Sequence, residues 1–121
     1  MASQIIVTTS DGLDGYRVRK YLGVVRGIAV RGATPGQGLQ ALGQVLSGNL
    51  QAGWQLYEQV CEAARDDAFD RMVRHAEELQ ADAILAMRYH GTEVKEGITE
   101  VLAYGTAVQL QLPEAQPATG P

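Results

Sequence analysis

Four side chains could bind a metal ion through sulfur or imidazole: Cys61, His75, Met87 and His90. Cys61 and His75 lie fourteen residues apart in a segment predicted to be helical, which is about 21 Å along a continuous helix. They therefore cannot share an ion within one subunit. Copies of one histidine could converge around an oligomer axis, so we expect His90, at a strand end, to be the first metal candidate and Cys61 the second.

A simpler interpretation needs no metal, and we favour it. Cys61 would then be a small buried side chain, and His75 would flank the core and make a hydrogen bond. We accordingly expect no cofactor, with a transition metal ion as the alternative.

Two arginines, Arg26 and Arg88, each interrupt an otherwise apolar segment. An arginine that faces a subunit contact usually pairs with a carboxylate. The candidate partners in the following turn are Glu93, Glu96 and Glu100. The alternative is an anionic ligand or substrate held between subunits near Arg26, Arg88 and Tyr104, and structural pairing is the interpretation that we favour.

The sequence contains little that indicates a catalytic or a phosphate-binding motif. The glycine-rich segment RGATPGQG (residues 31–38) lacks both the G-K-[ST] ending and the third glycine of nucleotide-binding loops. A chain with one cysteine, two histidines and no G-x-S-x-G sequence offers no recognisable nucleophile arrangement. We therefore expect no catalytic residues and a protein that is not an enzyme.

The composition limits the kinds of binding partner and the cellular compartment that we expect. The 121 residues include ten Lys and Arg against fourteen Asp and Glu, for a net charge of −4. This balance disfavours nucleic acid and anionic membranes as partners. A single cysteine suits a reducing compartment, and no apolar run approaches the length of a membrane span. We expect a cytoplasmic protein with one domain over residues 1–112.

Hydrophobic spacing predicts an α+β chain with a β-α-β-β core. A long helix with one apolar stripe, supported by Asp67/Arg71 and Asp70/Arg74 pairs, is expected to cover a three-stranded antiparallel sheet. The expected order is a short strand at residues 4–9, a strand at 21–30, a loop at 31–38, a short helix at 39–48, the long helix at 52–80, a strand at 83–90, a turn at 91–97, a strand at 98–112 and a disordered tail at 113–121.

The strands have no clearly polar face. Small residues alternate with larger apolar ones, so the long helix should cover the small-residue face and leave the other face in water. The face expected under the long helix carries Tyr21, Gly23, Val25, Gly27 and Ala29, with Val101, Ala103, Gly105 and Ala107. An exposed apolar sheet face of this kind usually marks a subunit contact, so we expect a homo-oligomer.

Four segments occur together in this order: IIVTT (residues 5–9), YLGVVRGIAVRGA (21–33), ARDDAFDRMVRHAEELQADAILAMRYH (64–90) and YGTAVQL (104–110). Their order and spacing resemble the YbjQ-like family of uncharacterised bacterial proteins. The resemblance implies a dodecin-like subunit, a homopentameric ring with extra short strands at the subunit contacts, and a heavy-metal-binding role in some descriptions of the family. It implies no catalytic residues.

Two positions depart from the family pattern. Gln80 stands where the family usually has a glycine that ends the long helix, so a left-handed cap there would be strained or replaced by another turn. The family's Gly-Gly-Arg-Ser stretch is replaced by residues 48–51, GNLQ. An anion site that depends on that arginine would be missing.

Overall fold

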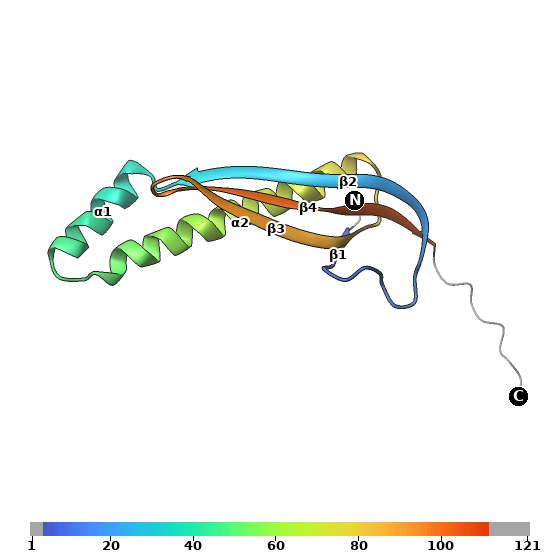
Figure 1. Cartoon of the computed structure of the whole chain (residues 1–121), viewed down its shortest axis with the longest axis horizontal. Helices are drawn as coiled ribbons and strands as arrows, with labels where there is room; N and C mark the ends of the chain where they lie inside the picture. Colours follow the sequence, from blue (N-terminus) through green and yellow to red (C-terminus); the bar gives the residue numbers. More distant parts are fainter. Residues whose placement is uncertain (1–3, 112–121) are drawn as a thin grey trace, which may run out of the picture.

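The computed structural model describes residues 4–111, which form four β-strands and two α-helices (Figure 1). The elements are β1 Ile6–Val7, β2 Arg17–Gly32, α1 Pro35–Leu46, α2 Gln51–Glu78, β3 Ala83–Lys95 and β4 Ile98–Gln111. The predicted tail at residues 113–121 lies outside the described residues. Among the described residues, no helix is long and apolar enough to cross a membrane.

The four strands form one sheet in the order β1-β3-β4-β2. β4 pairs antiparallel with both β2 and β3, while β1 pairs parallel with β3 over two residues. Figure 1 shows α2 running along one face of this sheet, with α1 beyond its end. The predicted α+β fold, with three main antiparallel strands, an extra short strand and one covering helix, is confirmed.

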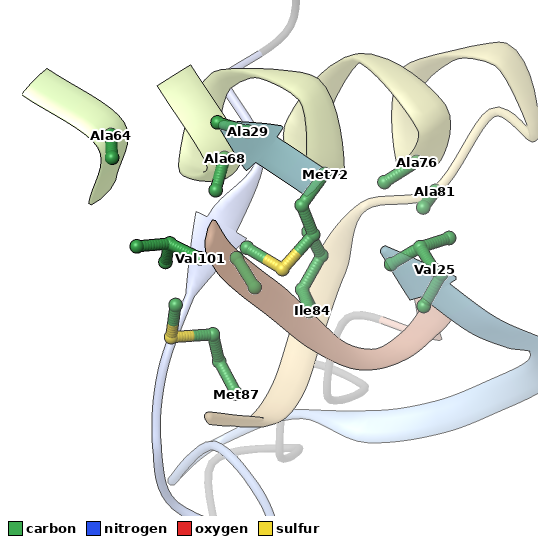
Figure 2. Packing of buried hydrophobic residues seen from close by; sticks show 12 residues of the cluster. Val25, Ala29, Ala64, Ala68, Met72, Ala76, Ala81, Ile84, Met87 and Val101 are labelled. Atoms are coloured by element: carbon green, nitrogen blue, oxygen red, sulfur yellow. The ribbon is translucent and has the colours of Figure 1, made fainter. Parts of the chain in front are cut away.

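Small residues allow α2 to lie very close to the sheet. Ala68 and Met72 of α2 are fully buried, as are Val25 and Ala103 of the sheet. Figure 2 shows Met72 among the buried residues of this core. A Cβ atom added to Gly27 would lie 2.5 Å from the backbone nitrogen of Met72 and would overlap the carbonyl oxygen of Ala68. Glycine is therefore required at residue 27 by the approach of the helix backbone.

A smaller cluster lies on the other face of the sheet. Ala83, Leu85 and Val108 are buried there, with Leu13 and Leu110 packed against them. The segment around Leu13 thus covers one end of the face that α2 leaves open.

The prediction that Tyr21 lies on the face covered by α2 is wrong. Tyr21 pairs with Val108, whereas Gly23 pairs with Ala107, and the register shifts between the two pairs. Gly23 has φ +109°. This bulge, which a glycine accommodates, turns Tyr21 to the face opposite α2.

The predicted loop at residues 31–38 is also wrong in part, because β2 continues to Gly32 and α1 begins at Pro35. The Thr34 hydroxyl accepts a hydrogen bond from the Gln37 backbone, and the Gln37 side chain accepts one from the Thr34 backbone. This capping box, together with proline at the first helical position, starts the helix.

The turn predicted at residues 91–97 is shorter than expected. β3 continues to Lys95, and Thr92 and Glu93 pair with Glu100 and Thr99 of β4. Cross-strand pairing thus extends both strands through a polar segment whose composition favours a turn.

The acid–base pairs predicted within the long helix do not form. Asp67 instead forms a salt bridge with Arg31 at the end of β2. Arg71 donates to the backbone carbonyl of Ile28. These side chains connect the helix to the sheet rather than to the next helical turn.

α2 ends without the glycine that the family usually has at this position. Gln80 adopts the left-handed conformation with φ 62°. Its backbone N–H donates to Glu77, and that of Ala81 donates to Ala76, at 2.9 and 3.0 Å. This is the six-to-one and five-to-two hydrogen-bond pattern that commonly ends helices with glycine. Of the two predicted alternatives, the left-handed cap is the one present.

Candidate functional site

Strand pairing places three of the predicted site residues in one row. Arg26 of β2 pairs with Tyr104 of β4, and Tyr104 pairs with Arg88 of β3. Paired residues lie on the same side of a sheet, and the neighbouring Ala103 and Gly105 are buried under α2. The row therefore lies on the face opposite α2, which we call the outer face.

Apolar side chains surround this row on the outer face. Val24 is 68% exposed, and Tyr21, Ile28 and Val30 are also exposed. Ile28 pairs with Leu102, which pairs with His90, so His90 lies one row away from Arg26. The outer face thus combines an apolar surface with two guanidinium groups and one imidazole.

Arg88 is tied to the N-terminal segment. Its Nη1 donates to the carbonyl oxygens of Thr9 and Met87, both at 2.8 Å. Beside it, Ala86 has φ 53°, and its backbone N–H donates to Ser10. Arg88 therefore fastens the segment after β1 to a bulge in β3.

The glutamates suggested as arginine partners lie elsewhere within the subunit. Glu93 accepts hydrogen bonds from the Tyr57 hydroxyl at 3.5 Å and from the Gly97 backbone at 3.4 Å. Glu100 pairs with Val30 and Thr92, two rows away from Arg26. Among the described residues, Arg26 therefore forms no salt bridge within the subunit.

His75 lies at the free edge of β2. Its Nδ1 accepts a hydrogen bond from the backbone N–H of Arg26 at 3.3 Å, in keeping with the prediction of a hydrogen-bonded flanking histidine. Arg71 binds the Ile28 carbonyl, and Asp67 binds Arg31 along the same edge. Side chains of α2 thus occupy the backbone N–H of Arg26 and the backbone carbonyl of Ile28 at this edge, which opposes the addition of another strand there.

The two metal candidates are not brought together. His90 lies on the outer face, while Cys61 belongs to α2 on the opposite side of the sheet. Among residues 4–111, no group of three or more His, Cys, Asp or Glu side chains could hold a metal ion. The donor set of one subunit therefore does not fit a heavy-metal site.

Cys61 instead has a tyrosine beside it on α2. The thiol of half-buried Cys61 and, to a smaller extent, the carboxylate of Glu93 raise the pKa of Tyr57 above its ordinary value. On β3, burial is the largest cause of a raised pKa of Tyr89, and the charge of Asp66 adds to it. Both tyrosines are therefore neutral at physiological pH and can serve only as uncharged polar contacts.

The sequence prediction missed a cleft between the two helices. It has a volume of about 160 Å³ and is lined chiefly by glutamines, with Ala41, Ala52 and Leu56 between them. The glutamines are Gln37, Gln40, Gln44, Gln55 and Gln59. Their spacing of three or four residues along each helix is the signal that could have revealed it.

Comparison with known proteins agrees with this fold and leaves the activity open. A family model described as "Putative heavy-metal-binding", that of the YbjQ family, matches residues 5–111. A UPF0145 protein of Solibacter usitatus is 44% identical over 91% of this chain and 96% of its own length. UPF0145 proteins of Burkholderia thailandensis and Legionella pneumophila are 45% and 46% identical over 90% and 86% of this chain, and 96% of their own lengths. None of these names states an enzymatic activity.

A solved structure of similar fold is a protein of unknown function of the DUF74 family from Pediococcus pentosaceus. It is 18% identical, covers 88% of this chain and 98% of its own length, and superposes with a TM-score of 0.52. The length of the family match and the identity to the UPF0145 proteins decide the relationship: this chain is a member of the YbjQ family of uncharacterised bacterial proteins.

Proposed function

We propose that the chain works as a homo-oligomer, a pentameric ring whose subunits meet through the outer face of the sheet. The ring serves as a structural or small-ligand-binding assembly rather than as an enzyme. We place it in the cytoplasm, in keeping with a single cysteine that has no disulfide partner in the chain.

The exposed outer face is the observation that carries this proposal. α2 covers one side of the sheet, while Tyr21, Val24, Ile28 and Val30 remain exposed on the other. A contiguous apolar surface of this kind costs free energy in water and is typical of a protein contact. In a five-fold ring, each subunit places this face against a different surface of its neighbour, which removes the face from water.

Arg26 gives this contact a polar component. Within the described residues, its side chain has no carboxylate partner, and a guanidinium in a subunit contact needs one to offset its lost hydration. A carboxylate of the neighbouring copy provides it. Under this proposal Arg26→Ala weakens the ring, while an unchanged oligomer would favour an anionic ligand at Arg26, Arg88 and Tyr104.

Light scattering at micromolar concentration tests the ring. Five copies of the 13.0 kDa chain give a mass of about 65 kDa. The Val24→Asp/Ile28→Asp variant places charges on the outer face and should give a smaller particle, whereas Val24→Ile/Ile28→Val keeps the total apolar volume and should leave the mass unchanged. A wild-type mass of 13.0 kDa would contradict the proposal.

A heavy-metal-binding oligomer is the second candidate, favoured by the description of the family. Because one subunit does not supply the ligands, the ion would have to bind copies of His90 from different subunits, or copies of Cys61. Calorimetric titration with zinc and with copper tests this candidate. Binding that His90→Ala abolishes supports it, and equally weak heats in both proteins remove it.

A further inference from the structure

The cleft between α1 and α2, which we call the amide cleft, is lined unlike an ordinary contact between two helices. Helices that pack on each other usually present apolar side chains to the space that they share. Here five of the eight lining residues are glutamines, while Leu39 and Leu46 of α1 are 71% and 79% exposed. The facing sides of the two helices are therefore polar where packing alone would favour apolar residues.

The glutamine side chains use few of their hydrogen-bonding groups within the subunit. The Oε1 of Gln37 accepts from the backbone N–H of Thr34, and the Oε1 of Gln44 accepts from the side chain of Asn49, both at 3.1 Å. Within residues 4–111, no hydrogen bond joins a glutamine of α1 to a glutamine of α2. The amide N–H groups of all five glutamines, and the carbonyl oxygens of the other three, are thus left to water or to a ligand.

The surroundings of the amide cleft carry no unpaired charge. None of its lining residues is charged, and residues 33–57 contain no Lys, Arg, Asp or Glu. A second cavity of about 110 Å³ shares Gln37 and Gln59 with the cleft and extends to Arg31, whose guanidinium is already paired with Asp67. An ionic group placed in the cleft would lose hydration without gaining a countercharge. A ligand of this cleft would therefore be uncharged.

The apolar part of the lining favours a flat molecule. Ala41 of α1, with Ala52 and Leu56 of α2, lies between the glutamines. Small side chains on both helices leave a slot with a volume of about 160 Å³. A cavity of about 150 Å³ accommodates a benzene ring. The cleft thus has room for a flat ring whose faces contact the apolar residues and whose edges meet the amides.

We propose that the amide cleft binds a neutral planar heterocycle with hydrogen-bond donors and acceptors side by side on its edge, which is the chemistry of a nucleobase. A glutamine side chain carries one acceptor beside a two-proton donor and pairs bidentately with the N6 and N7 atoms of adenine. Gln40 belongs to α1 and Gln55 to α2. Glutamines from both helices can therefore engage two edges of one ring.

This proposal does not depend on the ring of subunits, because both helices of the cleft belong to one chain. The Val24→Asp/Ile28→Asp variant alters the outer face and leaves the cleft intact. It should therefore bind the heterocycle with the affinity of the wild type, whatever its mass. Loss of binding in this variant would place the ligand on the outer face and overturn the proposal.

NMR titration of the full chain with adenine, cytosine, uracil and adenosine tests the proposal. Gln40→Met/Gln55→Met keeps the length and helix propensity of both side chains but removes their hydrogen bonds. It should raise the Kd of the best-bound compound about tenfold. Gln51→Met, in the first turn of α2 and outside the lining of the cleft, is the matched control and should leave the Kd unchanged.

A second variant tests the slot without touching the amides. Ala41→Leu fills the space between the helices and should also raise the Kd about tenfold. Far-UV circular dichroism shows whether the helices of each variant are retained. A Kd that neither Ala41→Leu nor Gln40→Met/Gln55→Met changes would place the ligand elsewhere and overturn the proposal.

Two comparison ligands define the chemistry of the site. Glucose is neutral but not planar and should bind more weakly than the heterocycles. Adenosine monophosphate should bind no more tightly than adenosine, because no charged residue lines the cleft. No binding of any heterocycle by the wild type overturns the proposal. Tighter binding of glucose, which indicates a polyol site, or of the monophosphate, which indicates a phosphate site, also overturns it.

Discussion

The two halves of α2 lie in very different surroundings. From Ala64 onward the helix buries Ala64, Ala68, Met72 and Ala76 against the sheet. Before that, it buries Ala52 and Val60 and lies beside α1, which buries no residue of its own. We call residues 33–57, which comprise α1 and the first turns of α2, the helical arm. One continuous helix thus belongs to a tightly packed core at one end and to a loosely packed arm at the other.

This difference shows where each part obtains its stability. The packed end depends on small residues that let two backbones approach, so its stabilising contacts lie within the subunit. The arm instead leaves Leu39, Leu42 and Leu46 exposed, so few of its stabilising contacts lie within the subunit. Added methyl groups should therefore harm the packed end and benefit the arm.

The largest effect is expected for Gly27→Ala in the packed end. The new Cβ would lie 2.5 Å from the Met72 nitrogen and 2.8 Å from the Arg71 Cβ, and a helix backbone cannot yield as a flexible side chain does. Overpacking of this kind should lower the free energy of unfolding by about 3 kcal/mol. Urea denaturation followed by circular dichroism measures it. A loss below about 0.5 kcal/mol would mean that α2 does not lie directly on β2.

Much of the packed end could be predicted from the sequence. The alternation of small and large residues in β2 and β4 correctly identified the face under α2, because burial imposes a period of two on a strand. Tyr21 was misplaced because the bulge at Gly23 depends on the register with β4, which the local pattern does not contain. Asp67 was misassigned because its partner, Arg31, is distant in sequence.

A smaller effect of opposite sign is expected for Gln80→Gly, where the packed end of α2 terminates. Gln80 adopts φ 62°, which costs an ordinary residue free energy and glycine little. The substitution should raise the free energy of unfolding by about 1 kcal/mol, despite the greater freedom of glycine in the unfolded chain. The preceding residue, Leu79, has φ −87°, so Leu79→Gly is the control and should be destabilising. Equal effects at both residues would contradict the left-handed cap.

Gly43→Ala makes the complementary change in the arm. A Cβ there meets no atom within 4 Å, and alanine favours the helical state over glycine. The substitution should stabilise α1 locally by about 0.5 kcal/mol. Hydrogen exchange of the α1 amides measures this. Faster exchange would show that the arm is packed as closely as the sheet-bound half of α2.

The candidate sites were less predictable than the fold. Arg26 and Arg88 could be selected because each interrupts an apolar segment, and the strand pairing then placed them in one row with Tyr104. The start of α1 was predicted at residue 39 instead of Pro35, because the proline and glycines of residues 31–38 were interpreted as a loop, although Thr34 and Gln37 form a capping box. The leucines and glutamines of α1 have the spacing of an ordinary amphipathic helix, and periodicity alone does not indicate which side faces the core.

The smallest effect is expected from replacing Tyr89. The pH dependence of the free energy of unfolding then distinguishes the packed end from the arm. Burial beside the acidic side of α2 raises the pKa of Tyr89, with Asp66 as a further cause. A group whose pKa is higher in the folded state contributes full stability below its unfolded pKa, here 10.0, and loses it as the pH rises through the folded value. The free energy of unfolding should therefore fall from about pH 9 to about pH 11, and less steeply in Tyr89→Phe. In the arm, the thiol of Cys61 is the largest cause of the raised pKa of Tyr57, and burial and Glu93 add to it. Tyr57→Phe should then resemble Cys61→Ala in its pH profile, whereas Tyr89→Phe should not, and an effect of Cys61→Ala on the titration of Tyr89 would contradict this assignment of causes.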